Sequence, residues 1–276
     1  MDEMITVQDY NKAGVGLIGS LTLRFSPIAF KLMFNEDDIP DNSIFPLRDT
    51  GNRFAMCQAF SLVRRNRKAI TMLNDDHWCP WPLACFKLFP LDDDDFDTMG
   101  TKLFMKDPEK SVRFMRENYP WLNCETAPIG FTVAPLESCG FIPDVIVIYC
   151  RVSQLRSLIM AAKYESSEMF SMVPDTLASC CYSTIPLLNG QKYSVTIPDP
   201  GEYERSLVGE DEIIFSMRGD RLGPLMSGLM ALKDRGFDYP GLSYDMNFNF
   251  PRAQFYNDMF AKWGLATGET WDPEAR

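Results

Sequence analysis

Residues 130–149 read GFTVAPLESCGFIPDVIVIY and contain two apolar runs, at 130–135 and 145–149. Both runs are rich in β-branched residues and are short, which favours strands buried on both faces over helices. We therefore expect these two segments to form the centre of a β-sheet, and the rest of the chain is read outward from them.

Other segments carry strand or helix signals of the same kind. The stretch SLTLRFSPIAFKLMF at 20–34 suggests a strand, a break at Ser26-Pro27 and a second strand. Asp107-Pro108 is typical of a helix start, and Gly236 of a helix end. Further strands are expected at 69–73, 193–197 and 212–217, helices at 53–68, 108–118, from 153 and at 223–235, and a helix or turn from 174.

Strands and helices alternate irregularly, and no repeated βαβ unit with a glycine-rich first turn is present. This pattern predicts an α+β fold, with residues 1–236 forming a single mixed-sheet domain with flanking helices. Residues 237–276 are rich in aromatic, Asn and Asp side chains. We expect them to form a C-terminal extension that packs on the core or on a partner subunit.

The 276-residue chain has a net charge of −11 and no apolar run of membrane-spanning length. The charge disfavours nucleic acid and anionic membranes as partners, and the acidic N-terminus lacks a signal-peptide layout. We expect a soluble, cytoplasmic protein in which the eight cysteines are free thiols. The basic cluster at 64–68 is either an anion site or the solvated last turn of a helix.

A single histidine, His77, restricts the possible chemistry. Any Ser-His-Asp or Cys-His arrangement would have to use it, and a zinc site with several His ligands is excluded within one chain. The common nucleotide-binding, hydrolase and metalloprotease motifs are absent. As a candidate catalytic residue, His77 is either a general base or a loop residue that forms a salt link with Asp75 and Asp76.

His77 begins the segment HWCPWPLAC, which also holds Trp78, Cys79, Trp81 and Cys85. The spacing of its two cysteines is not that of a metal motif, so most cysteines of the chain could be buried core residues.

Lys31 follows an apolar strand. It is a candidate catalytic residue if its strand is buried, or an edge-strand gatekeeper if it is not.

Several short segments, in order, resemble one family. The chain is similar over most of residues 15–235 to the bacterial and archaeal family known as domain of unknown function 169. The matching segments are FSPIAFK at 25–31, CQ at 57–58, CP at 79–80 with Ala84, VAPL at 133–136, FIPDV at 141–145 and EDEI at 210–213.

The resemblance implies a cytoplasmic protein, frequent in anaerobes, with no established activity. It places cysteines at Cys57 and Cys79 and near Cys180 or Cys181, and a strand that ends in Lys31. The chain departs from the family at residues 81–83, which are Trp-Pro-Leu instead of small residues, and it has no cysteine near 198–205. These departures put a ligand shared by all members, and a common four-cysteine site, in doubt.

From residue type and resemblance we form one main hypothesis. Three thiolates from separate segments would hold an iron–sulfur cluster with an open iron, and the enzyme would catalyse a lyase or reductive step on an aromatic or carboxylated small molecule. The metal ligands would be Cys57, Cys79 and Cys180, with His77 and Lys31 as catalytic residues and Gln58, Trp78, Trp81 and Arg205 as substrate-binding residues.

Two alternatives stay open. A metal-free hydrolase or isomerase could use His77 or a thiol as acid or base, with no cofactor. A non-catalytic domain could bind a small ligand or a partner, with all its cysteines in the core. A homo-oligomer is compatible with each of them.

Overall fold

The two apolar runs form strands β3 and β4 of one six-stranded sheet. The computed structural model describes residues 6–100, 105–164, 166, 169–170, 172, 175, 177–239 and 252–270. The strands are β1 (Ile28–Met33), β2 (Ile70–Leu73), β3 (Gly130–Pro135), β4 (Val145–Arg151), β5 (Tyr193–Thr196) and β6 (Glu212–Arg218).

The strand order in the sheet is β2-β3-β1-β4-β6-β5. In the centre, Ala29 of β1 lies opposite Ala134 of β3 and Ile146 of β4. Every pair of these strands is antiparallel, so the expected mixed sheet is wrong in this detail. In the described part of the chain, parallel pairing is limited to single bridges such as that of Ile44 with Ile70.

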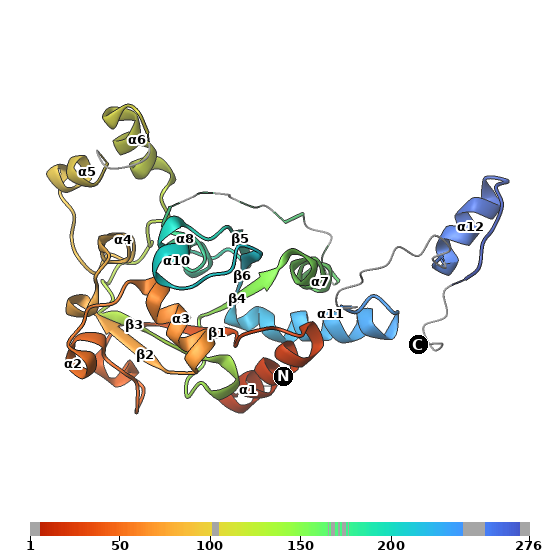
Figure 1. Cartoon of the computed structure of the whole chain (residues 1–276), viewed down its shortest axis with the longest axis horizontal. Helices are drawn as coiled ribbons and strands as arrows, with labels where there is room; N and C mark the ends of the chain where they lie inside the picture. Colours follow the sequence, from red (N-terminus) through yellow and green to blue (C-terminus); the bar gives the residue numbers. More distant parts are fainter. Residues whose placement is uncertain are drawn as a thin grey trace.

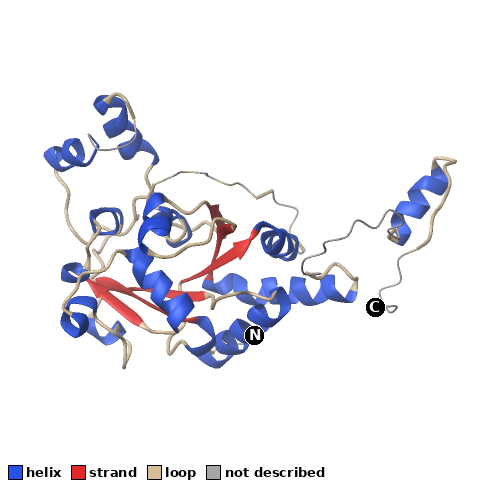
Figure 2. Cartoon of the chain, viewed as in Figure 1, coloured by secondary structure: helices blue, strands red, loops and turns tan. Residues whose placement is uncertain are grey.

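Each central strand is buried on both faces because helices cover both sides of the sheet (Figures 1 and 2). In β1, Ile28 and Phe30 belong to the core on one face, and Ala29 belongs to the core on the other. This alternation follows from the two-residue period of a strand. Burial on both faces explains why these segments are continuously apolar rather than alternating.

The first face, defined as the side of Ile28 and Phe30, is covered by short helices and one longer one. They are α3 (Met56–Asn66), α4 (Pro80–Cys85), α8 (Ser179–Tyr182) and α9 (Ile185–Leu188), with α10 (Pro200–Arg205) packed on α3.

The second face is covered by three longer helices, α1 (Val7–Leu21), α7 (Val152–Ala162) and α11 (Leu222–Asp234). Peripheral helices are α2 (Pro46–Thr50), α5 (Asp93–Gly100), α6 (Pro108–Asn118) and α12 (Gln254–Lys262).

The structure confirms the α+β class and most of the predicted elements. Asp107 caps α6 by accepting the Glu109 N–H at 3.0 Å, and Gly236 follows α11 with a φ of 72°. The strand expected at 20–25 is wrong, because α1 extends to Leu21 and ends at Thr22, whose φ is 51°. Leu17 and Leu21 are fully buried against the second face.

The C-terminal segment is described in part. Residues 252–270 contain α12, which lies beyond the end of α11 in Figure 1. Residues 240–251 and 271–276 lie outside the described part of the chain, as does the helix start expected at Pro174. The division at residue 236 and the packing role of the extension stay predictions. Across the described residues, no helix has the length and apolar character needed to cross a bilayer.

Candidate active site

The three cysteines proposed as metal ligands line one cavity of about 220 Å³. The cavity lies on the first face of the sheet, where α3, α4, α8 and α10 begin. Its lining residues are Ala55, Met56, Cys57, Cys79, Trp81, Pro82, Leu177, Ala178, Cys180, Asp199, Pro200, Gly201, Glu204 and Arg205.

Each cysteine is brought to the cavity by a different element. Cys57 lies in the first turn of α3, and its Sγ donates to the carbonyl oxygen of Gly201 at 3.7 Å. Cys79 directly precedes α4, and its sulfur accepts the backbone N–H of Trp81. Cys180 lies in the short helix α8 and is buried.

The thiols are neutral in this environment. Burial raises the pKa of Cys57 and of Cys79 above the usual thiol value. The pKa of Cys180 is raised by its hydrogen bond with Cys181 and by burial. The Arg205 guanidinium acts in the opposite direction on the pKa of Cys57 and Cys79, because its charge favours thiolates. A bound metal cation would complete the conversion of the thiols to thiolates, since metal binding displaces thiol protons.

A single metal ion and an iron–sulfur cluster need different arrangements of ligands. Within the described residues, no three His, Cys, Asp or Glu side chains are gathered around one point as ligands of a single ion. In an iron–sulfur cluster, by contrast, each thiolate binds a different iron and the ligands surround a larger volume. The described residues therefore form no ready site for a single ion, and a cluster held by the three cysteines stays a prediction.

Arg205 and two tryptophans form the polar and aromatic side of the cavity. The Arg205 guanidinium carbon lies 4.9 Å from the centre of the exposed Trp78 ring. Trp81 lines the cavity and stacks on Tyr119, with ring centres 5.2 Å apart. Trp81 and Arg205 thus line the cavity, and Trp78 contacts Arg205 from outside the lining. Substrate binding by these three residues stays a prediction.

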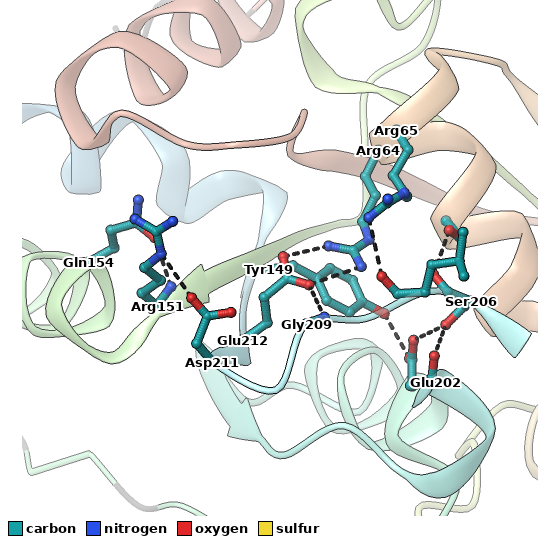
Figure 3. Close-up of polar contacts among 12 residues, drawn as sticks. Arg64, Arg65, Tyr149, Arg151, Gln154, Glu202, Ser206, Gly209, Asp211 and Glu212 are labelled. Atoms are coloured by element: carbon teal, nitrogen blue, oxygen red, sulfur yellow. Dashed lines mark hydrogen bonds and ion pairs between the residues drawn. The ribbon is translucent and has the colours of Figure 1, made fainter. Parts of the chain in front are cut away.

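Glu202 lies directly behind the cavity and is 1% exposed. Its Oε1 accepts the hydroxyl of Tyr149 at 2.7 Å, and its Oε2 accepts that of Ser206 at 2.7 Å (Figure 3). Its Oε1 also accepts the Ser179 hydroxyl at 3.3 Å. Burial and the nearby Asp199 carboxylate raise the pKa of Glu202 to about 7, against the hydrogen bonds that favour its charged form. A carboxyl group with this pKa can hold or release a proton near neutral pH.

Arg64 anchors the same network from α3. It forms a two-pronged ion pair with Glu212, at 2.7 and 3.1 Å, and lies 4.1 Å from the centre of the Tyr149 ring (Figure 3). Arg64 is only 2% exposed. The prediction that residues 64–68 form a solvated turn is therefore wrong for Arg64, which points into the protein.

His77 lies on the same face but outside the cavity lining. Its ring meets Phe131 edge-on at 5.5 Å, and neither ring nitrogen has a hydrogen-bond partner among the described residues. The expected salt link is absent, since Asp76 instead accepts the backbone N–H groups of Leu47 and Leu73. Burial lowers the pKa of His77 to about 4. Its catalytic role stays a prediction, and the ring is neutral near pH 7.

Lys31 and Gln58 are also outside the cavity lining. Lys31 lies in β1, a central strand paired on both sides, so the edge-strand interpretation is wrong. The alternation along β1 places Lys31 on the second face, opposite the cavity. The Gln58 Oε1 accepts the Ala55 backbone N–H at 2.8 Å at the start of α3, which gives this side chain a structural task.

Sequence reasoning selected Arg205 but missed the rest of α10 and its N-cap, which supply Asp199, Gly201 and Glu202. A signal was available, because Asp199-Pro200 repeats the Asp-Pro pattern of α6. Asp199 caps α10 by accepting the Glu202 N–H at 3.0 Å. The burial of Glu202 itself has no local signature.

Comparisons with known proteins agree with the sequence resemblance. The family model of domain of unknown function 169, described as "Uncharacterised ArCR", matches residues 16–228. No curated protein and no solved structure matches the chain. The matched region includes the whole sheet and every residue that lines the cavity. The chain therefore belongs to the domain of unknown function 169 family.

Proposed function

We propose that the protein is a cytoplasmic enzyme of small-molecule metabolism whose reactive centre is the cavity of Cys57, Cys79 and Cys180. The observation that carries this proposal is that three cysteines from three distant segments line one cavity. The other cavity residues add apolar walls, one cation at Arg205 and two carboxylates at Asp199 and Glu204, and small-molecule sites usually combine apolar walls with a few polar groups in this way. The reaction would be a lyase or reductive step on an aromatic or carboxylated molecule.

The three thiols would hold an iron–sulfur cluster. When bound, such a cluster supplies a Lewis-acidic iron that three protein ligands leave open. The protein's part is to hold the thiolates, exclude water from the cavity and keep a positive charge at Arg205. The cytoplasm suits this proposal because it keeps thiols reduced, and all eight cysteines are free.

A metal-free acid–base enzyme is the second candidate, and the observation that favours it is the pKa of about 7 at Glu202. The neutral thiols and His77 support the acid–base candidate less than Glu202 does. A thiol nucleophile needs a positive partner to ionise, and His77 lies outside the cavity lining.

Iron and acid-labile sulfide analysis after anaerobic purification separates these candidates. We expect iron and sulfide in the wild-type protein, and their loss in each of Cys57→Ala, Cys79→Ala and Cys180→Ala. Cys139→Ala and Cys150→Ala are matched controls, because both cysteines are buried in the core of the second face and should retain iron. Thermal melting of each variant checks that it is folded.

Two results would overturn the cluster. One is a wild-type protein that stays free of iron after anaerobic purification and reconstitution. The other is a set of cavity variants that retain as much iron as the two controls.

A further inference from the structure

Arg205 has unused hydrogen-bonding capacity at the cavity. Its Nε is shielded from solvent and has no hydrogen-bond partner among the described residues. Its Nη1 lies 3.3 Å from the carboxylate of Glu204, whose side chain is 67% exposed. An ion pair this exposed contributes less than about 1 kcal/mol, so a ligand can displace Glu204 at low cost.

The guanidinium is held in position by its surroundings. Arg205 folds back along α10 over Gly201, where an added Cβ would lie 2.2 Å from Nη2. The ring of Trp78 lies on its other side at 4.9 Å. The nearby Asp199 is occupied, since its two oxygens accept the backbone N–H groups of Glu202 and Ser179, each at 3.0 Å. The fork of Arg205 is therefore directed by packing and not by a strong ion pair.

The cavity volume limits the size of the ligand. About 220 Å³ is below the roughly 300–1,000 Å³ typical of sites for drug-sized ligands. A cavity of about 150 Å³ can hold a benzene ring, so a single ring fits only if the cavity is otherwise empty. A cluster held by the three cysteines would take part of this space and leave room for a small aliphatic group.

We propose that Arg205 binds the carboxylate of a small aliphatic acid that enters the cavity. The inference rests on the proposed function, because it narrows the substrate class of the same site. A carboxylate matches the planar donor fork of arginine and can accept from Nε and an Nη together. The apolar wall formed by Ala55, Met56 and Pro82 then contacts the carbon chain.

Ligand-observed NMR with succinate, benzoate and uncharged succinamide tests the inference on the full chain, as purified and after chelator treatment. We expect succinate to bind the protein as purified more tightly than either of the other probes. Arg205→Gln should weaken succinate binding about tenfold or more, because a charge-assisted hydrogen-bond pair is lost. Glu204→Gln should strengthen it, because the competing carboxylate is removed.

Two further variants sharpen the test. Gly201→Ala keeps the arginine but displaces its guanidinium, so it should also weaken succinate binding. Arg116→Gln is the matched control, because Arg116 also lies over an aromatic ring, Phe96 at 4.1 Å, and pairs with a carboxylate, Asp93 at 2.8 Å. It lies on α6, outside the cavity lining, and should leave binding unchanged.

The inference is overturned if succinamide binds as well as succinate, if benzoate binds more tightly in the protein as purified, or if Arg205→Gln and Arg116→Gln behave alike. Its failure is distinguishable from that of the proposed function. Loss of the cluster hypothesis would appear as an iron-free protein that still binds succinate through Arg205, and loss of the ligand hypothesis as an iron-containing protein that does not.

Discussion

His77 and Glu202 are two buried titratable groups on the same side of the sheet, and their surroundings differ. His77 is 6% exposed and packs as a ring against Phe131, with no hydrogen-bond partner among the described residues. Glu202 is 1% exposed and accepts three hydroxyl groups. Burial favours the neutral form of both, but only the surroundings of Glu202 are arranged for a polar group.

The difference matters for chemistry near neutral pH. The pKa of His77 is lowered to about 4 and that of Glu202 is raised to about 7. Histidine is by residue type the usual proton carrier near pH 7, yet here the carboxyl group titrates in that range. The environment, and not the side-chain type, selects which group can exchange a proton.

The two groups also act on stability in opposite directions. Between about pH 4 and 6.5 the unfolded chain protonates His77 and the folded protein does not, so stability falls as the pH falls. Between about pH 4.5 and 7 the folded protein keeps the Glu202 proton that the unfolded chain releases, so stability falls as the pH rises. The two slopes largely cancel in the wild-type protein, and single substitutions should reveal each of them.

The largest expected effect comes from the arginine that anchors the Glu202 network. Arg64→Ala should lower the free energy of unfolding by about 3–5 kcal/mol, because it leaves the buried Glu212 without its ion-pair partner. Arg151→Ala breaks an exposed pair with Asp211 and should cost less than about 1 kcal/mol. Urea denaturation measures both. Equal losses would show that the buried network does not stabilise this region.

Glu202→Gln should remove the part of the pH dependence in which stability falls as the pH rises. The amide resembles the protonated acid, so the variant should gain about 2–3 kcal/mol relative to wild type between pH 5 and pH 8. Denaturation curves at the two pH values give this difference. If it is absent, Glu202 is ionised in the folded protein throughout this range.

His77→Phe should remove the part of the pH dependence in which stability rises with the pH. Relative to wild type, it should gain about 2 kcal/mol when the pH is lowered from 8 to 5, because the unfolded wild-type chain alone gains a proton there. His77→Gln, which buries a polar amide in the same place, is the comparison and should be less stable than His77→Phe at pH 8. A pH-independent difference between His77→Phe and wild type would contradict the depressed pKa.

The smallest expected effect is that of one hydroxyl. Ser206→Ala removes the 2.7 Å hydrogen bond to Glu202 and should cost about 1 kcal/mol. It should also raise the pKa of Glu202 further, because this bond favours the charged carboxylate. The pH dependence of unfolding, compared with that of Ser179→Ala at the 3.3 Å contact, tests whether the shorter bond has the larger effect.

Much of the fold could be predicted from local sequence signals. The apolar runs of β3 and β4 predict strands, and the Asp-Pro pair at the start of α6 predicts a helix. Both signals are local because strand burial and helix capping depend on adjacent residues. The end of α1 was mistaken for a strand. Its apolar residues Leu17 and Leu21 are buried by tertiary packing, and a short apolar segment does not distinguish helix from strand.

The candidate site also has residues that the sequence selected and positions that it did not predict. Residue type and family resemblance were enough to select Cys57, Cys79 and Cys180, and these three line one cavity. Arg205 and Trp81, selected as substrate-binding residues, line the same cavity, and their role stays a prediction. The sequence assigns Lys31 to a buried strand but does not show which face of the sheet carries its side chain, because a one-residue change of register moves a side chain to the other face.

The sequence by itself determined the strands of the sheet and the helices α3, α6, α7 and α11, because these follow from short-range pattern, and the family resemblance supplied the three thiols that line the cavity. The tertiary structure alone decided which groups are charged. Glu202 and His77 owe their shifted pKa values, and Arg64 owes its ion pair with Glu212, to segments far away in the chain, and no local pattern encodes how much water such segments exclude.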